Sequence, residues 1–189
     1  MSLRFAGFSA ALLFTLTTFP AVSPTDPSSS RAVSASAASF AGFEGRTIDL
    51  RSGWGAATAC QTDGHTTQCW ATEAEMDRAI GAMPVGTPAT DGQSNTAALA
   101  TCSSSLRLYS GLSYTGSVLA LTSTGTLINL STYGFDNTTT SYKVGACSAL
   151  FYDGANGSGS QYPGSTGAFS QSASMATGWN DRVSSVYMF

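Results

Sequence analysis

A six-residue pattern that occurs twice in the second half of the chain is the strongest constraint on its fold. The copies are DNTTTS at 136–141 and NDRVSS at 180–185, which share two Asp or Asn residues, two variable residues, a Ser or Thr, and a Ser. We call each copy a signature. Carboxylate, amide and hydroxyl oxygens gathered in a short loop are the ligands that Ca²⁺ prefers, in sets of roughly 6 to 8. The same residue types also hydrogen-bond their own backbone in turns that hold no ion, and this structural role is the alternative.

Each signature closes a segment whose beginning also repeats. The stretch LRLY ends at Tyr109, 27 residues before Asp136, and the stretch ALFY ends at Tyr152, 28 residues before Asn180. A repeat at this spacing indicates a duplicated supersecondary unit of about 40 residues. Short apolar stretches separated by Gly and Ser clusters predict strands, and no convincing helical stripe follows Thr101. The sequence therefore predicts two four-stranded antiparallel units packed as a β-sandwich.

The two units resemble Greek-key motifs of the βγ-crystallin superfamily, of the microbial calcium-binding type. The segment 109–116 matches the aromatic-x4-aromatic-x-Gly hairpin pattern of that family. The second unit departs from the pattern at Gly157, which stands where the second aromatic residue belongs, so we expect a looser hairpin there. The resemblance covers 102–189, with motifs at 102–145 and 146–189, and implies an all-β, βγ-crystallin-like Greek-key sandwich.

The resemblance also implies two Ca²⁺ ions, each bound between the two motifs by oxygens from both. Each signature holds a single carboxylate, which implies an affinity typical of extracellular modules and a stabilising role. The implied ligands are the hydroxyls of Thr140 and Ser184, the main-chain carbonyls of Thr138 and Arg182, side-chain oxygens of Asp136, Asn137, Asn180 and Asp181, and the hairpin residues Ser110 and Asp153.

The first 20 residues have the composition of a secretory signal peptide. Arg4 precedes an apolar run without acidic residues, and Ser and Thr interrupt that run too often for a membrane span. A Ser-, Ala- and Pro-rich stretch follows, which we interpret as a linker or propeptide, so that 1–37 precedes the folded part. We expect a secreted, extracellular protein with no membrane span after signal cleavage.

The charge argues against a nucleic-acid partner. The chain carries a formal charge of −3, and removal of 1–37 lowers Lys+Arg from 8 to 6 and Asp+Glu from 11 to 10, which gives −4. Only 10% of the residues are charged, so the chain lacks the basic surface that binds phosphate backbones. We therefore expect no nucleic-acid partner.

Four cysteines in a secreted chain favour two disulfides, which can pair in three ways. Cys60 and Cys69 enclose an eight-residue loop, whereas Cys102 and Cys147 precede equivalent strands of the two repeats. We therefore favour Cys60 with Cys69 and Cys102 with Cys147. A zinc site is the alternative use of four cysteines, but neither pair has Cys-x2-Cys spacing.

Residues 38–101 form an N-terminal extension that the resemblance does not explain. A Thr-x-x-Glu capping box predicts a short helix over Glu73–Ile80. Met76, Ile80 and Met83 form an apolar stripe too small to stand alone, so we expect the helix to pack on one face or end of the sandwich. With the predicted disulfide, the extension would be a small stapled unit.

The sequence offers little support for catalysis. His65 is the single histidine, in a Gly-containing loop, and the chain has no nucleophile-elbow or zinc-protease motif. We expect no enzyme activity and predict a calcium-binding protein whose ion stabilises an extracellular fold. The alternative is a secreted peptidase inhibitor or toxin-like effector on the same fold, with an extracellular protease as partner and loop 61–68 inserted into its cleft.

Overall fold

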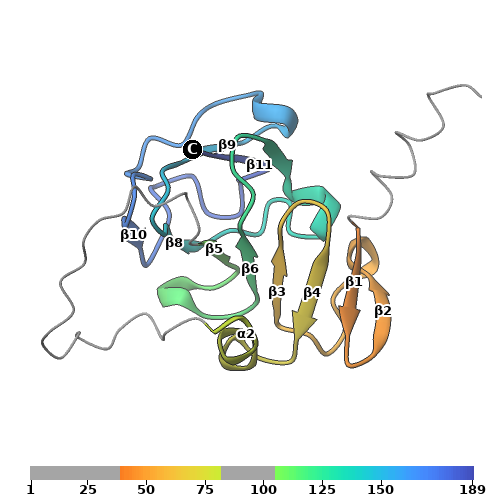
Figure 1. Cartoon of the computed structure of the whole chain (residues 1–189). Helices are drawn as coiled ribbons and strands as arrows, with labels where there is room; N and C mark the ends of the chain where they lie inside the picture. The colour runs from red at the N-terminus through yellow and green to blue at the C-terminus, as the bar shows by residue number, and fades with distance from the viewer. Residues whose placement is uncertain (1–38, 82–104) are drawn as a thin grey trace, which may run out of the picture.

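The computed structural model describes residues 39–81 and 105–189, which fold into two β-sheets and one α-helix (Figure 1). The predicted signal peptide and linker at 1–37 lie outside the described residues, as does the expected boundary near 101. The strands are β1 Phe40–Phe43, β2 Arg46–Asp49, β3 Ala59–Thr62, β4 Thr67–Trp70, β5 Leu106–Tyr109, β6 Val118–Leu121, β7 Leu127–Asn129, β8 Ser141–Lys143, β9 Ala149–Tyr152, β10 Gln171–Ser172 and β11 Ser185–Met188. Helix α2 spans Glu73–Ile80, and short 3-10 turns lie at Leu50–Ser52, Leu112–Tyr114, Leu130–Tyr133 and Ala155–Gly157.

The two repeats form two Greek keys that exchange their third strands. In the first repeat, β8 returns to pair antiparallel with β5, whose other neighbour is β6, while β7 crosses to the second sheet beside β11. In the second repeat, β11 returns to pair with β9, while β10 crosses to the first sheet beside β8. A fourth strand that lies beside the first is the Greek-key connection. The predicted all-β Greek-key sandwich is confirmed.

The sheets differ from the expected pair of four-stranded antiparallel units. One sheet has eight strands in the order β10-β8-β5-β6-β3-β4-β1-β2, and the other has three in the order β7-β11-β9. The second strand of the second repeat is reduced to one bridge between Tyr152 and Gln161. The core between the sheets contains fully buried side chains from both, including Leu108, Leu119 and Phe151.

The extension, expected to pack on one face or end of the sandwich, continues the first sheet with its own strands. Strand β3 pairs in parallel with β6, from Ala59 opposite Val118 to Thr62 opposite Leu121. Strands β4, β1 and β2 follow outward in the same sheet (Figure 1). Because β6 would otherwise end the sheet with unpaired N–H and C=O groups, the extension supplies the missing neighbour of the first Greek key.

Helix α2 covers the face of this sheet opposite the main core. It begins at Thr72, whose hydroxyl accepts from the N–H of Glu75 at 3.2 Å, and ends at Gly81 in the left-handed conformation. Met76 is fully buried in a second apolar cluster on the sheet, and Ile80 packs at its edge. The predicted helix and its docking are confirmed, whereas Met83 lies outside the described residues.

A buried ion-pair cluster joins α2 to β5. The guanidinium of Arg107 contacts Oε1 of Glu73 at 2.6 Å and Oδ1 of Asp77 at 2.5 Å, and the hydroxyl of Tyr109 donates to Glu73 at 2.7 Å. Burial raises the pKa of the Tyr109 phenol, and the neighbouring Glu73 adds to this effect. A buried charge is tolerated only when it is paired, so Arg107 requires the helix in this position.

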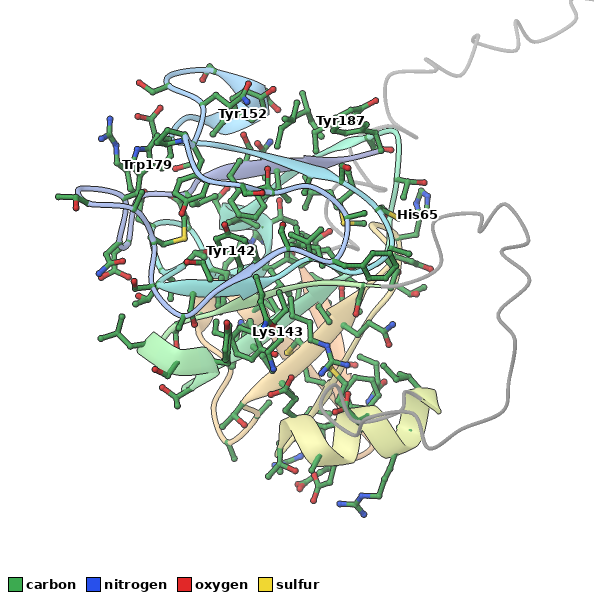
Figure 2. The ribbon with its side chains drawn as sticks, turned by 90° about the vertical axis from the view of Figure 1, so that its left-hand side faces the viewer. His65, Tyr142, Lys143, Tyr152, Trp179 and Tyr187 are labelled. Carbon is green, nitrogen blue, oxygen red and sulfur yellow. A yellow bond between two sulfur atoms is a disulfide. The ribbon has the colours of Figure 1, made fainter. Side chains whose placement is uncertain are left out.

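Neighbouring residues of β8 show the two faces of the sheet. Tyr142 lies in the main core, where its ring contacts Phe151 edge to face at 5.1 Å between centroids. Lys143 lies on the α2 side, with Nζ 4.5 Å from the ring centre of Tyr114 (Figure 2). This alternation is the period-two pattern of a strand with both faces covered.

The disulfide between Cys60 and Cys69 is confirmed and joins directly opposed residues of β3 and β4. Cys147 is also disulfide-bonded, and its predicted partner, Cys102, lies outside the described residues. Within 39–81 and 105–189, no helix is long and apolar enough to cross a membrane.

Candidate metal site

The two signatures bond to each other through equivalent backbone atoms. The N–H of Asn137 donates to the carbonyl of Val183, and the N–H of Asp181 donates to the carbonyl of Thr139, both at 3.0 Å. Asn137 and Asp181 have φ of 52° and 55°, a left-handed backbone that Asn and Asp tolerate better than most residues. The sequence duplication thus becomes a local two-fold arrangement.

Side-chain oxygens repeat this reciprocal exchange. The hydroxyl of Thr140 donates to Oδ1 of Asp181 at 3.0 Å, and the hydroxyl of Ser184 donates to Oδ1 of Asn137 at 3.3 Å. Both hydroxyl residues are buried, whereas Asn137 and Asp181 are exposed. Each hydroxyl–acceptor pair therefore combines one oxygen from each Greek key, with one residue buried and the other exposed to solvent.

Backbone bonds join each pair to the hairpin that carries one further predicted ligand. The N–H of Thr140 donates to the carbonyl of Tyr109, and the N–H of Ser184 donates to the carbonyl of Tyr152, both at 2.8 Å. Ser110 and Asp153 are the next residues along the hairpins. We therefore define the first site as Ser110, Thr138, Thr140 and Asp181, and the second site as Asn137, Asp153, Arg182 and Ser184.

The first residue of each signature lies at the periphery. Asp136 and Asn180 are both exposed. The carboxylate of Asp136 accepts from the side-chain amide of Asn137 at 3.3 Å, within its own signature. Their predicted role as direct ligands is therefore less well supported by contacts than that of Asp181 and Asn137, which bond across the two keys.

The sixth residue of each signature has a role that sequence reasoning missed. The hydroxyl of Ser141 donates to the carbonyl of Gly111 at 2.6 Å and accepts from the N–H of Tyr114 at 3.0 Å. The hydroxyl of Ser185 donates to the carbonyl of Gly154 at 2.6 Å and accepts from the N–H of Gly157 at 2.9 Å. Each Ser ties its signature to the hairpin of the same repeat. The presence of Ser at the sixth position of both signatures was the sequence signal that could have indicated this role.

The second hairpin is closed by bonds equivalent to those of the first, although the strand that follows it pairs through the single Tyr152–Gln161 bridge. The N–H of Ser110 donates to the carbonyl of Ser117 at 2.9 Å, and the N–H of Asp153 donates to that of Ser160 at 3.1 Å. A side chain at Gly157 would meet Leu127 of β7 at 3.2 Å. The exchanged third strand thus occupies the space beside Gly157.

The donor set of both sites suits a hard cation. It consists of hydroxyl, amide and carbonyl oxygens with few carboxylates, and these are ligands of Ca²⁺ more than of zinc or copper. Consistent with this composition, 39–81 and 105–189 contain no group of three or more His, Cys, Asp or Glu side chains placed to hold a metal. The oxygens already lie at mutual distances of 3.0 to 3.3 Å across the two keys.

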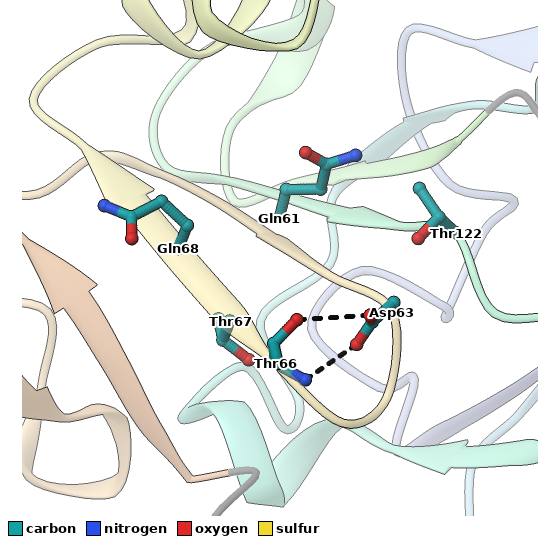
Figure 3. Close-up of a pocket in the computed structure, with 6 residues that line it drawn as sticks. All are labelled: Gln61, Asp63, Thr66, Thr67, Gln68 and Thr122. Carbon is teal, nitrogen blue, oxygen red and sulfur yellow. Dashed lines mark hydrogen bonds between the residues drawn. The ribbon is translucent and has the colours of Figure 1, made fainter.

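Two surface pockets flank the turn between β3 and β4. One has a volume of about 440 Å³ and is lined by residues of β3 and β4 with Thr122 (Figure 3). The other, of about 360 Å³, includes the exposed His65. Asp63 borders both, and its carboxylate accepts from the N–H groups of His65 and Thr66 at 2.8 and 2.7 Å. The bond from the Thr66 N–H is the largest cause of the lowered pKa of Asp63. The Asp63 carboxylate thus caps its own turn.

Loop 61–68, which the inhibitor alternative would insert into a protease cleft, is partly paired strand. Gln61 and Thr62 belong to β3, and Thr67 and Gln68 belong to β4, where they pair with each other inside the eight-stranded sheet. Only 63–66 form the turn. The part of this loop that could enter a protease cleft is therefore the four-residue turn, and the inhibitor alternative stays a prediction.

No protein-family model and no curated protein sequence matches this chain. Among solved structures, it is similar to a βγ-crystallin from Ciona intestinalis, with 22% identity, a TM-score of 0.39, and coverage of 45% of this chain and 99% of that one. It is also similar to a βγ-crystallin domain from Clostridium beijerinckii, with 20% identity, a TM-score of 0.38, and coverage of 45% of this chain and 97% of that one. A βγ-crystallin domain from Flavobacterium johnsoniae shows 24% identity, a TM-score of 0.35, and coverage of 44% of this chain and 92% of that one. The fold assignment rests on the exchanged third strands and the paired signatures in this chain itself.

Proposed function

We propose that this chain is a secreted protein that binds two Ca²⁺ ions between its Greek keys, and that the ions stabilise its fold. The observation that carries the proposal is the reciprocal oxygen exchange, in which Thr140 meets Asp181 and Ser184 meets Asn137. Turns that only stabilise their own backbone would bond within one repeat, whereas these side-chain oxygens bond across the two repeats. The Cys60–Cys69 disulfide supports an oxidising, extracellular setting.

The chain's own residues would hold the ions as follows. Thr140 and Asp181 supply side-chain oxygens to the first site, with Ser110 from the adjoining hairpin. Ser184 and Asn137 supply the second site. A bound Ca²⁺ contributes a divalent positive charge that attracts oxygens of both keys at once. Because these sites require the folded arrangement of both signatures, binding favours the folded state.

Calcium titration of a matched pair of variants tests the proposal. Thr140→Val removes the ligand hydroxyl, whereas Thr139→Val changes the preceding residue, whose buried hydroxyl lacks a hydrogen-bond partner in the described structure. By isothermal titration calorimetry we expect two sites in the wild type and in Thr139→Val. In Thr140→Val we expect the first site to be lost and the second to be weakened, since each ion draws on both keys.

Ser184→Ala should give the mirror result, with loss of the second site. Retention of two unchanged sites in both Thr140→Val and Ser184→Ala would contradict the assignment of these hydroxyls as ligands. Circular dichroism of each variant in the absence of calcium verifies that the fold is retained.

A further inference from the structure

The two sites differ in charge although their backbones are equivalent. Ser110 and Thr138 of the first site correspond to Asp153 and Arg182 of the second. The second site thus carries a carboxylate and a guanidinium at positions where the first site carries two neutral side chains. In the first site, Oδ1 of Asp181 accepts only from the neutral hydroxyl of Thr140 among the bonds the structure describes.

The side chain of Arg182, a residue of the second site, is held in a defined position. Its Nη2 contacts Oδ2 of Asp153 at 2.6 Å, and its Nη1 donates to the carbonyl of Gly178 at 3.4 Å. The guanidinium carbon also lies 4.9 Å from the ring centre of Trp179, a buried side chain that gives it a fixed aromatic surface. Three different groups therefore hold the guanidinium, which distinguishes it from an unrestrained surface arginine.

The same contacts engage both oxygens of the Asp153 carboxylate. Oδ1 accepts from the N–H of Ser160 at 2.5 Å, and Oδ2 is paired with Arg182. Each oxygen of this carboxylate therefore has a partner, one on the backbone of the hairpin and one on the guanidinium. Asn137 of the second site donates its side-chain amide to the carboxylate of Asp136 at 3.3 Å.

We propose that Arg182 is a built-in counter-cation of the second site, which occupies the Asp153 carboxylate until a divalent cation displaces it. This inference rests on the proposed calcium function. It makes the two sites unequal. An ion entering the first site meets a carboxylate that is bonded to a neutral hydroxyl. An ion entering the second site must release the guanidinium and tolerate its positive charge nearby. The Arg182 side chain is 47% exposed, so it can swing into solvent without disturbing the core.

The experiment isolates the second site and then removes the guanidinium. In Thr140→Val the second site is the one that remains, and Thr140→Val/Arg182→Gln tests that site without the counter-cation. We expect the double variant to bind calcium more tightly than Thr140→Val, on the order of tenfold, because one unit of like charge is removed from the neighbourhood of the ion. Arg51→Gln in the Thr140→Val background is the control, because it removes an equal charge beside Asp49 in the extension.

A spectroscopic readout tests displacement directly in the wild type. Calcium addition should shift the NMR resonances of the Arg182 guanidinium and the Trp179 indole together with those of the second site, as the guanidinium leaves its position. The same titration should leave Arg51 unchanged.

The outcomes separate this inference from the proposed function. If the wild type binds calcium at the first site but Arg182→Gln leaves affinity at the second site unchanged or lower, the counter-cation role is wrong and the calcium function stands. If no variant and no wild-type protein binds calcium, the proposed function fails and this inference fails with it. An affinity gain of similar size from Arg51→Gln would reduce the effect to overall charge and also overturn the inference.

Discussion

The hydroxyls of Ser141 and Ser185 each hold a hairpin to a strand through one donated and one accepted bond. Ser185→Ala should therefore leave the N–H of Gly157 and the carbonyl of Gly154 without partners. An unsatisfied polar group costs about 1 to 3 kcal/mol when buried, and Gly154 and Gly157 are half-buried, so we expect the free energy of unfolding to fall by about 1 kcal/mol. Urea denaturation measures it.

The exposed residue Ser131 provides the control, since Ser131→Ala should change the free energy of unfolding by no more than about 0.5 kcal/mol. An equal effect of both substitutions would show that the hairpin bonds of Ser185 contribute nothing specific.

At the same residue scale, the sequence indicated which side chains belong to the site but not how they are paired. The repeated pattern identified Thr140 and Ser184 as oxygen donors, and the structure places each across from the other repeat. The contact between Arg182 and Asp153 joins residues 29 positions apart and has no local pattern. Sequence reasoning considered only the main-chain carbonyl of Arg182, so the charge on its side chain was overlooked.

At the scale of elements, the apolar contact of helix α2 with the sheet centres on one fully buried side chain, Met76. Met76→Ala should leave a cavity between the helix and strands β3, β5 and β6. Substitutions of this kind cost about 2 to 5 kcal/mol, because lost burial and the cavity both contribute. Ile80→Ala, at the partly exposed end of the same stripe, should cost clearly less. Chemical denaturation of both variants measures the loss in the free energy of unfolding. Equal losses for the two variants would show that α2 is not docked through Met76.

The helix was predictable because its signals are local, whereas the placement of the extension was not. A capping Thr, an apolar stripe and a terminal Gly lie within ten residues and specify α2. The parallel pairing of β3 with β6 joins segments that are 59 positions apart, from Ala59 to Val118. Four-residue strands with no linking motif carry no sequence signal for such a partner, so the extension was expected beside the sandwich and not within its sheet.

At the scale of the whole molecule, the exchanged third strands and the crossed signature bonds make each Greek key dependent on the other. Strand β7 of the first key completes the sheet of the second, and β10 of the second key joins the sheet of the first. The proposed ions lie at the same junction, where Thr140 meets Asp181 and Ser184 meets Asn137. Calcium should therefore stabilise both keys together, as one cooperative unit.

Thermal unfolding of the mature protein, followed in millimolar calcium and in excess EDTA, tests this account most directly. A ligand that binds only the folded state stabilises it by about 2.7 kcal/mol per site at a hundredfold excess over Kd. We predict one cooperative transition in both conditions, with a Tm that rises with calcium concentration and returns to its lower value in EDTA. An identical Tm in calcium and EDTA would contradict the account and leave the paired signatures with a purely structural role.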